Sequence, residues 1–211
     1  QLGEVLGVRH GKTLIVGDGV VAYHAAKTAH GLGSEVVVLG LDSKRGDEWS
    51  RRFGDGFRFQ LSSADAIGHH LLDTDLLVGA VLKKGARAEA VVTRDQIASM
   101  QSGSVAVDVS IDQGGCLETS RPTSHSDPIY FDEGVLHYCV TNMPGAYPRT
   151  STLALTSAVF PYTLLLANQG LDAVFENPGF LKGLQVHQGK LRSETIARDL
   201  GLTGALDLQS R

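Results

Sequence analysis

The sequence has 211 residues, of which 19 are basic and 23 acidic, so its formal net charge is −4. An acidic balance argues against nucleic acid as a partner, because nucleic-acid-binding domains usually carry a basic patch. Hydrophobic residues make up 42% and charged residues 20%, which is typical of a folded globular chain and excludes disorder as the main state. Glycine is abundant, with 25 residues, which predicts tight turns or close approaches of the backbone to a ligand.

The two cysteines, Cys116 and Cys139, are too few for a disulfide framework. One bridge between them is an alternative, but a reduced chain in the cytoplasm is favoured. No apolar run approaches 18 residues and no signal peptide is visible, so no membrane partner is expected. The first residue is Gln1 rather than Met, which suggests a chain cut from a longer one.

Short apolar runs alternate with helical patterns through the first half of the sequence. Strands are expected at 13–16, 35–39, 57–61, 76–81 and 104–109, with helices at 20–30, 45–53, 63–72 and 93–100. In the first helix, Val21, Ala25 and Ala29 are expected to share the core face. Strands that alternate with helices predict an α/β fold with a doubly wound parallel sheet, the Rossmann-like type that binds dinucleotides.

The pattern changes after Ile111. Residues 112–134 have the composition of a loop, 137–141 form a sixth strand candidate, and 151–169 predict a long apolar helix for a core or a subunit interface. The tail, 176–211, has short helical stretches, one of them capped by Ser193. We therefore expect a dinucleotide-binding domain at 1–150. Residues 151–211 are expected to form a C-terminal helical extension that packs on a substrate domain not contained in this sequence.

The motif Gly17-Asp18-Gly19-Val20-Val21-Ala22 follows the first strand and opens the first helix. This is the context that the dinucleotide fingerprint requires. Gly17 permits the tight turn, Gly19 lets a pyrophosphate approach the backbone, and the small Ala22 permits close packing of helix on strand. The motif predicts dinucleotide binding, and a tight turn without a ligand is the alternative.

In such folds an Asp or Glu about 20 residues further on binds the ribose 2′-hydroxyl. Here that position, at the end of the second strand, is Gly40, and Asp42, Lys44 and Arg45 follow. Asp42 reaches the ribose from the loop, or the acidic contact is missing and Lys44 or Arg45 accepts a 2′-phosphate. A third alternative is that these are solvated loop charges.

Four further stretches carry a family resemblance. They are Asp112-Gln113-Gly114-Gly115-Cys116, residues 118–123, Asn142-Met143-Pro144-Gly145 and residues 148–152. With them the sequence, from about residue 6 to 202, resembles the bacterial alanine dehydrogenases and, less closely, the related transhydrogenase α subunits. The resemblance implies an oxidoreductase that converts L-alanine, water and NAD to pyruvate, ammonia and NADH. It also implies a homo-oligomer, a hexamer in the family.

Carried over by position, the resemblance also implies a cofactor site. Ser62 matches a contact on the adenosine side, Arg45 stands where the family often has a lysine, and Gly40 replaces the family's ribose-binding Asp. Val81 and Leu82 match residues near the nicotinamide ribose, although Lys83-Lys84 follows where the family has an apolar residue and Pro. The expected cofactor-binding residues are Gly17, Gly19, Val20, Val21, Gly40, Asp42, Arg45, Ser62, Val81, Leu82, Val109, Asn142 and Met143.

Asp112 is the expected catalytic residue. It follows the fifth strand and therefore lies at the edge of the sheet where ligands bind. A carboxylate there can orient water or stabilise a cationic imine. The alternative is that Asp112 caps a turn before Gly114. His69, His70 and His137 lack the spacing of metal ligands, so no metal is expected.

No position matches the family's substrate-binding arginine and lysine or its catalytic histidine. We therefore expect this chain to bind NAD but to be inactive alone. Two other functions stay open. A catalytically silent nucleotide-binding paralogue is favoured by Gly40 and Lys83-Lys84, and a transhydrogenase-like subunit is disfavoured by the D-Q-G-G-C stretch.

Overall fold

The computed structural model describes residues 2–82 and 90–202. Its contacts divide the chain into two compact units, of which the first reaches Met143 and the second begins at Pro144. The sequence placed this boundary at residue 150. The roles expected for the two parts, cofactor binding and packing on a substrate domain, stay predictions.

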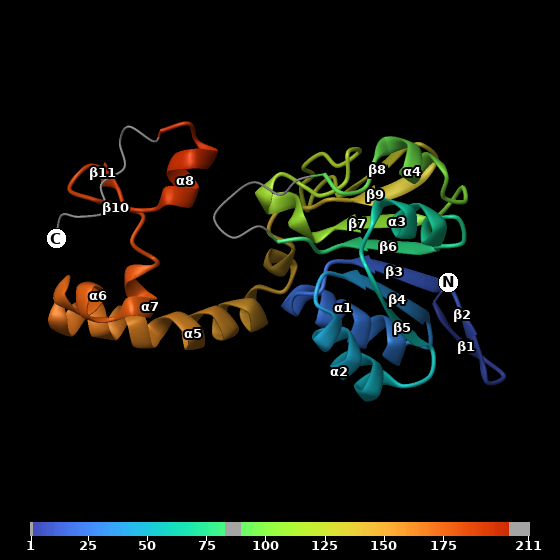
Figure 1. Ribbon diagram of the computed structural model, residues 1–211, viewed down its shortest axis with the longest axis horizontal. Coiled ribbons are helices and arrows are strands. Elements are labelled where there is room, and N and C mark those ends of the chain that lie inside the picture. The colour runs from blue at the N-terminus through green and yellow to red at the C-terminus, as the bar shows by residue number, and fades with distance from the viewer. Residues whose placement is uncertain (1, 83–89, 203–211) are drawn as a thin grey trace. The chain divides into compact units, whose positions relative to one another are not determined.

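The first unit is built on a seven-stranded sheet in the order β5-β4-β3-β6-β7-β9-β8 (Figure 1). The strands are β3 (Lys12–Val16), β4 (Glu35–Gly40), β5 (Phe57–Leu61), β6 (Leu76–Gly79), β7 (Val105–Asp108), β8 (Ile129–Asp132) and β9 (Val135–Tyr138). All neighbours pair in parallel except β8, which is antiparallel to β9. This topology confirms the doubly wound fold. Chain order reverses between β3 and β6, and such a switch point is where these folds bind ligands.

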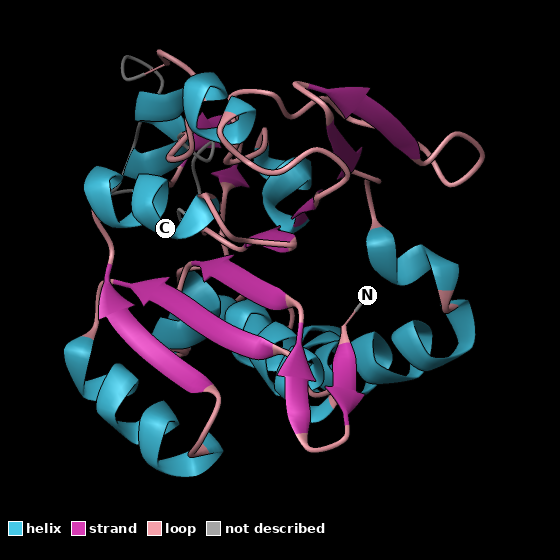
Figure 2. Cartoon of the chain, turned by 90° about the vertical axis from the view of Figure 1, so that its right-hand side faces the viewer, coloured by secondary structure: helices cyan, strands magenta, loops and turns pink. Residues whose placement is uncertain are grey.

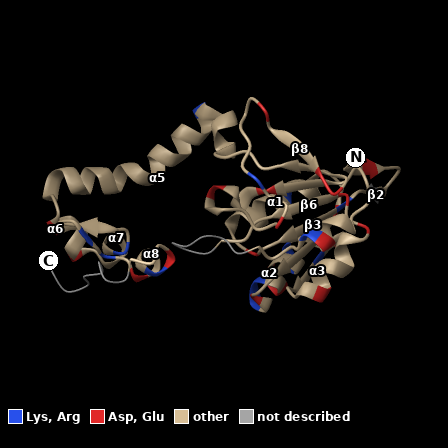
Figure 3. Ribbon diagram, turned by 90° about the horizontal axis from the view of Figure 1, so that it is seen from above, with Lys and Arg blue, Asp and Glu red and all other residues tan. Residues whose placement is uncertain are grey.

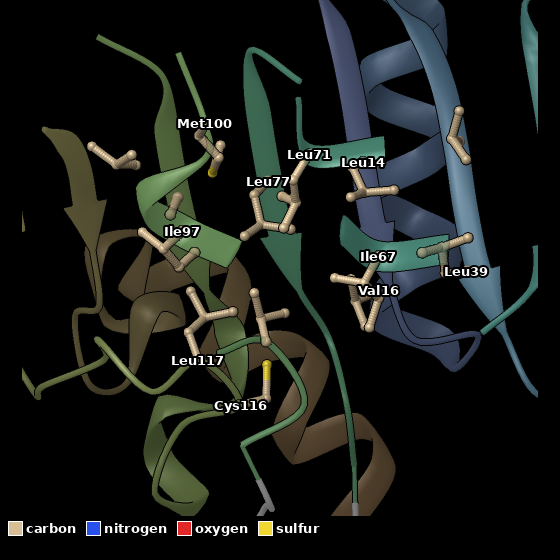
Figure 4. Packing of buried hydrophobic residues seen from close by; sticks show 14 of the residues in the cluster. Leu14, Val16, Leu39, Ile67, Leu71, Leu77, Ile97, Met100, Cys116 and Leu117 are labelled. Carbon is tan, nitrogen blue, oxygen red and sulfur yellow. The ribbon is translucent and has the colours of Figure 1, made fainter. Parts of the chain in front are cut away.

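Helices cover both faces of the sheet (Figure 2). On one face, α1 (Val20–Gly31) and α2 (Ser43–Phe53) pack over Ile15 and its neighbours. On the other face, α3 (Ala64–Leu71) packs over Leu14 and Val16, and α4 (Arg94–Ala98) lies further along, with Ile97 nearer to Leu77, as Figure 4 shows. Leu14, Ile15 and Val16 are consecutive and alternate between the faces, as strand geometry requires. Their continuous apolar run is the consequence of a strand buried on both sides.

Local sequence sets where these helices begin. The Ser63 side chain accepts a hydrogen bond from Ala66 N at 3.1 Å and so caps α3. Thr93 and Gln96 form a reciprocal capping box at the start of α4. Helix α1 differs, because Gly19 at its N-cap position supplies no side-chain acceptor. Its first backbone N–H groups therefore have no side-chain cap.

The expected core face of α1 is confirmed at Ala29 but was wrong by one position at Val21 and Ala25. Ala22, Ala26 and Ala29 are buried, whereas Val21 is 47% exposed. The physical reason is size, because alanine lets the helix lie close to the sheet and a β-branched side chain would hold it away.

Three hairpins in the described residues were not predicted from the sequence. They join β1 (Gly3–Val5) to β2 (Val8–His10), β8 to β9, and β10 (Val186–His187) to β11 (Lys190–Leu191). Their turns are Leu6-Gly7, Glu133-Gly134 and Gln188-Gly189, and both residues of each turn have positive φ. Such turns usually begin with Asn or Asp, so Leu, Glu and Gln gave no signal.

The second of these hairpins corrects the expected loop at 112–134, which contains β8. It also shifts the sixth strand from 137–141 to Val135–Tyr138.

The second unit contains α5 (Pro148–Gln169), α6 (Asp172–Glu176), α7 (Pro178–Leu181) and α8 (Glu194–Asp199). Ser193 caps α8 as expected, accepting from Ile196 N at 3.4 Å. Helix α5 starts at Pro148, a residue suited to the first turn. None of its residues is buried, so of the two expected positions the core is not found, and the subunit interface stays a prediction.

Helix α5 also carries almost no charge, as Figure 3 shows. Its length and apolar composition would allow it to cross a membrane, and it is the one helix of the described residues of which this is true. Apolar helices of soluble proteins meet the same criteria, so composition alone does not decide between them.

His137 makes the stability of the first unit depend on pH. Its ring is fully buried, with Nε2 at 2.7 Å from the Thr119 hydroxyl and Nδ1 at 3.0 Å from the Val135 carbonyl oxygen. Burial lowers the pKa of His137 below its ordinary value of 6.5. The unfolded chain therefore binds a proton at this residue more readily than the folded chain does.

We predict that the free energy of unfolding falls as the pH drops from about 7 to about 5, because protonation of His137 favours the unfolded chain. Urea unfolding at a series of pH values measures this. His137→Gln should reduce the dependence, and His10→Gln, at an exposed position, should leave it unchanged. A urea midpoint that is constant over this range, or that rises on acidification, would contradict the prediction.

Candidate functional site

Two loops diverge at the switch point of the sheet. Gly17 follows β3 and donates from its N to the Leu39 carbonyl at 2.8 Å. Ala80 follows β6 and donates to the Val16 carbonyl, also at 2.8 Å. Main-chain hydrogen bonds to neighbouring strands thus fix where each loop begins.

A cavity of about 300 Å³ opens between these loops. Its lining residues are Gly19, Val20, Val21, Ala80, Val81, Leu82, Val109, Ser110, Asp112 and Gln113. Seven of the residues singled out from the sequence are among them: Gly19, Val20, Val21, Val81, Leu82, Val109 and Asp112. The walls are mainly apolar with few polar groups, the usual character of a site for a flat organic ligand.

The two glycines of the loop are required for different reasons. Gly17 has φ +122°, and a Cβ built on it would lie 2.3 Å from the Ala80 carbonyl oxygen. Gly19 has an ordinary φ of −84°, and no atom lies within 4 Å of a Cβ built there. Nothing in the fold excludes a side chain at Gly19. The open space in front of it, beside the uncapped start of α1, fits the approach of a diphosphate.

A buried carboxylate organises the opposite wall of the cavity. Asp108, at the end of β7, has no exposed surface. Its Oδ2 accepts from Cys116 N at 2.7 Å, from Leu117 N at 3.3 Å and from the Ser120 hydroxyl at 2.6 Å. Its Oδ1 accepts from Ser110 N at 2.9 Å. Asp108 thereby ties both ends of the D-Q-G-G-C loop to the sheet.

Asp108 was not among the site residues expected from the sequence. The available signal was an acidic residue that ends an otherwise apolar strand, where it lies next to the switch point.

Asp112 and Asn142 lie together although 30 residues separate them. Asp112 is exposed on the short 3₁₀ helix η1 (Val109–Gln113), and its Oδ1 accepts from Asn142 N at 3.0 Å. Asn142 has φ +52°, a left-handed conformation that asparagine tolerates better than most residues. Met143 follows directly and starts η2 (Met143–Ala146). The turn at Gly114 is held by main-chain bonds and by Asp108, so Asp112 is not its cap.

The far end of the loop region contains the residues expected on the adenosine side. Ser62 N donates to the Gly40 carbonyl at 2.8 Å, which places the ends of β5 and β4 side by side. Asp42 caps α2, because its Oδ1 accepts from Lys44 N and Arg45 N at 3.0 and 3.3 Å. Arg45 in turn pairs with Asp42. The Lys83-Lys84 pair lies outside the described residues.

Cys116 is a buried thiol rather than a nucleophile. Burial, together with the nearby Asp108 carboxylate, raises the pKa of the Cys116 thiol from 9.0 to about 12. Cys139 is also free and buried, so the alternative of a bridge between them is not found. Within the described ranges, no group of three or more His, Cys, Asp or Glu side chains could hold a metal ion.

Comparisons with known proteins agree with this geometry. The family model for the "Alanine dehydrogenase/PNT, C-terminal domain" matches residues 1–194. An alanine dehydrogenase of Halomonas elongata is 46% identical over 202 residues, which are 95% of this chain and 54% of that protein. The chain thus spans about half the length of the curated relatives it matches.

Solved structures give the same result. An L-alanine dehydrogenase superposes with a TM-score of 0.84 at 42% identity, over 95% of this chain and 55% of that one. A transhydrogenase from Sinorhizobium meliloti superposes with a TM-score of 0.61 at 25% identity, over 69% and 42% of the two chains.

We predict that the Cys116 thiol does not react with a disulfide reagent at about pH 8 while the chain is folded, because the thiolate is the reactive form. The Cys139→Ala variant isolates Cys116 for this measurement by absorbance. Unfolding in guanidinium should expose the thiol and give one equivalent per chain. Stoichiometric labelling of the folded variant within the mixing time would show that Asp108 and burial do not suppress the thiolate.

Proposed function

This chain belongs to the family of alanine dehydrogenase/PNT C-terminal domains, and on that premise we propose that it is the NAD-binding part of an L-alanine dehydrogenase. The reaction is the reversible conversion of L-alanine, water and NAD to pyruvate, ammonia and NADH. The observation that carries the proposal is the cavity at the switch point, because seven residues singled out from the sequence line it. The alanine-dependent activity belongs to the proposal, since the chain spans about half of its relatives.

The residues at the cavity suit the binding of a dinucleotide. The free N–H groups at the start of α1, with Gly19 in front of them, would bind the pyrophosphate. Val81, Leu82 and Val109 would form apolar walls beside the nicotinamide and exclude water from it. When bound, NAD supplies the hydride acceptor, while the protein orients and shields the reacting carbon.

Asp112 suits a role in proton handling. It lines the cavity, and one of its oxygens is held by the Asn142 amide, so the carboxylate has a defined position. From there it would orient the attacking water or stabilise positive charge on the substrate nitrogen as the imine forms.

Capture of the substrate requires a further cation, which would pair with the carboxylate of alanine. Arg121 is a poor candidate, because its guanidinium lies 3.9 Å from the centre of the Tyr130 ring. No residue here matches the family's substrate-binding arginine and lysine. We therefore propose that residues 1–211 bind NAD(H) without oxidising L-alanine.

A homo-oligomer in the cytoplasm is part of the same proposal. The exposed apolar side chains of α5, among them Leu153, Phe160 and Leu164, would be covered by contact between subunits. The two buried, unpaired cysteines support a reducing compartment.

The two glycines of the loop provide a test of NAD binding. Gly19→Ala should leave the stability unchanged, because the fold has room for the methyl group, but should weaken NADH binding by about tenfold or more by blocking the pyrophosphate. Gly17→Ala is the matched comparison and should destabilise the chain through its positive φ and the clash with Ala80. NADH fluorescence titration and urea unfolding separate the two effects. Unchanged NADH affinity in the Gly19→Ala variant would contradict pyrophosphate binding at this loop.

Asp112→Asn tests the catalytic role. The amide oxygen can still accept from Asn142 N, so the loop is preserved while the charge is removed. In a preparation of the protein that oxidises L-alanine, we predict that kcat falls by about 100-fold, the effect of one acid–base or electrostatic group. NADH affinity should change little. A variant with normal kcat and reduced stability would instead assign Asp112 to the support of the Asn142 loop.

A further inference from the structure

The ribose position at the end of β4 lacks an acidic residue, yet a carboxylate lies there. A Cβ built on Gly40 would lie 2.5 Å from the Cβ of Asp18 and 2.7 Å from its Oδ2. The side chain of Asp18, the middle residue of the Gly17–Gly19 loop, thus occupies the space that a side chain at position 40 would fill.

This carboxylate is fixed by its neighbours. Its Oδ2 accepts from Leu41 N and from Asp42 N, both at 2.9 Å, and its Oδ1 lies 3.3 Å from the Arg45 guanidinium. The side chain is 17% exposed, so it is anchored but reaches solvent. A carboxylate offers about four lone-pair sites, which leaves capacity on Oδ1 for a hydroxyl donor.

Asp42 and Arg45, two of the three residues considered for this position, are already engaged. Asp42 Oδ1 caps α2, and Arg45 Nη2 lies 3.6 Å from Asp42 Oδ2. Arg45 also donates to the main-chain carbonyl of Asp18. The one guanidinium is therefore shared between two carboxylates and would have to leave them to pair with a 2′-phosphate, and the exposed Lys44 is the other cation of this segment.

We propose that Asp18 takes the place of the strand-end acid. Its carboxylate accepts from the adenosine ribose hydroxyls, and its charge sets the preference for NAD(H) over NADP(H). The carboxylate thus comes from residue 18 instead of residue 40, which faces it. Side chains at both positions would clash, because a Cβ on Gly40 would lie 2.5 Å from the Cβ of Asp18. This inference rests on the proposed function, because it concerns the same dinucleotide.

The experiment is titration of the full chain with NADH and with NADPH at equal ionic strength, followed by nucleotide fluorescence. Wild type should bind NADH more tightly. Asp18→Ala should weaken NADH binding by about 10- to 100-fold, the scale of one hydrogen bond to a charged group, and should hold or raise NADPH affinity. Asp42→Asn is the matched control, because asparagine caps a helix as well as aspartate does, and it should retain the NADH preference.

The position of the acid can be tested with the Asp18→Gly/Gly40→Asp double variant, because glycine at 18 also removes the Cβ that a side chain at 40 would meet. With no side chain at residue 18, the remaining close contact of a Cβ at residue 40 is the far end of the Phe59 ring at 2.7 Å, which can shift, so the double variant should recover NADH preference. Gly40→Asp alone should bind NADH less well than wild type, since two carboxylates then compete for one place. Urea unfolding identifies a variant that fails to fold. If Gly40→Asp alone fails, the double variant tests whether a carboxylate at residue 40 can replace that of Asp18.

Three results would overturn the inference. An Asp18→Ala variant that keeps the wild-type ratio of NADH to NADPH affinity excludes the role given to Asp18, and so does a wild type that prefers NADPH. In the first case the proposed function stands, and in the second the dinucleotide site stands while the NAD preference in the proposed function fails. Wild type that binds neither nucleotide refutes the proposed function and this inference together.

Discussion

The close approach of β3 to β6 at the point where the sheet order reverses is the constraint on which the site depends. Gly17 can make this approach because it has no side chain to meet the Ala80 carbonyl and can adopt a positive φ. The chain then turns into α1 with no side-chain cap, so backbone N–H groups remain for a ligand. The turn thus depends on the missing side chain of Gly17, and the uncapped start of α1, where we propose that the pyrophosphate binds, depends on Gly19.

The wall opposite the glycine loop depends on a different kind of interaction. A buried charge is costly unless hydrogen bonds satisfy it, and Asp108 meets this condition by accepting from the main chain at both ends of the D-Q-G-G-C loop. The arrangement fixes η1 and with it Asp112, which then holds Asn142. A residue that need not touch a ligand therefore positions two that are expected to do so.

The cofactor-binding edge illustrates why a motif and its chemistry can separate. Reading position 40 alone suggests that the acid for the ribose is missing, whereas the fold brings Asp18 to the same place. The adenosine ribose requires a carboxylate at a given place, and residue 18 or residue 40 could each supply one there. Gly40 and Asp18 are therefore understood as a pair, joined through the space they share.

Much of the fold follows from short-range signals. The strand Phe57–Leu61 and the caps Ser63, Thr93 and Ser193 are determined by the sequence, because apolar periodicity and side-chain capping act within a few residues. The glycine loop and the D-Q-G-G-C and N-M-P-G stretches likewise identify the family. Only the tertiary structure decided the x-Gly hairpins, the anchoring by Asp108, the contact of Asp112 with Asn142 and the position of Asp18 beside Gly40. Each of these depends on strands or loops that are distant in sequence, and the residue types involved have many other uses, so no local pattern distinguishes them.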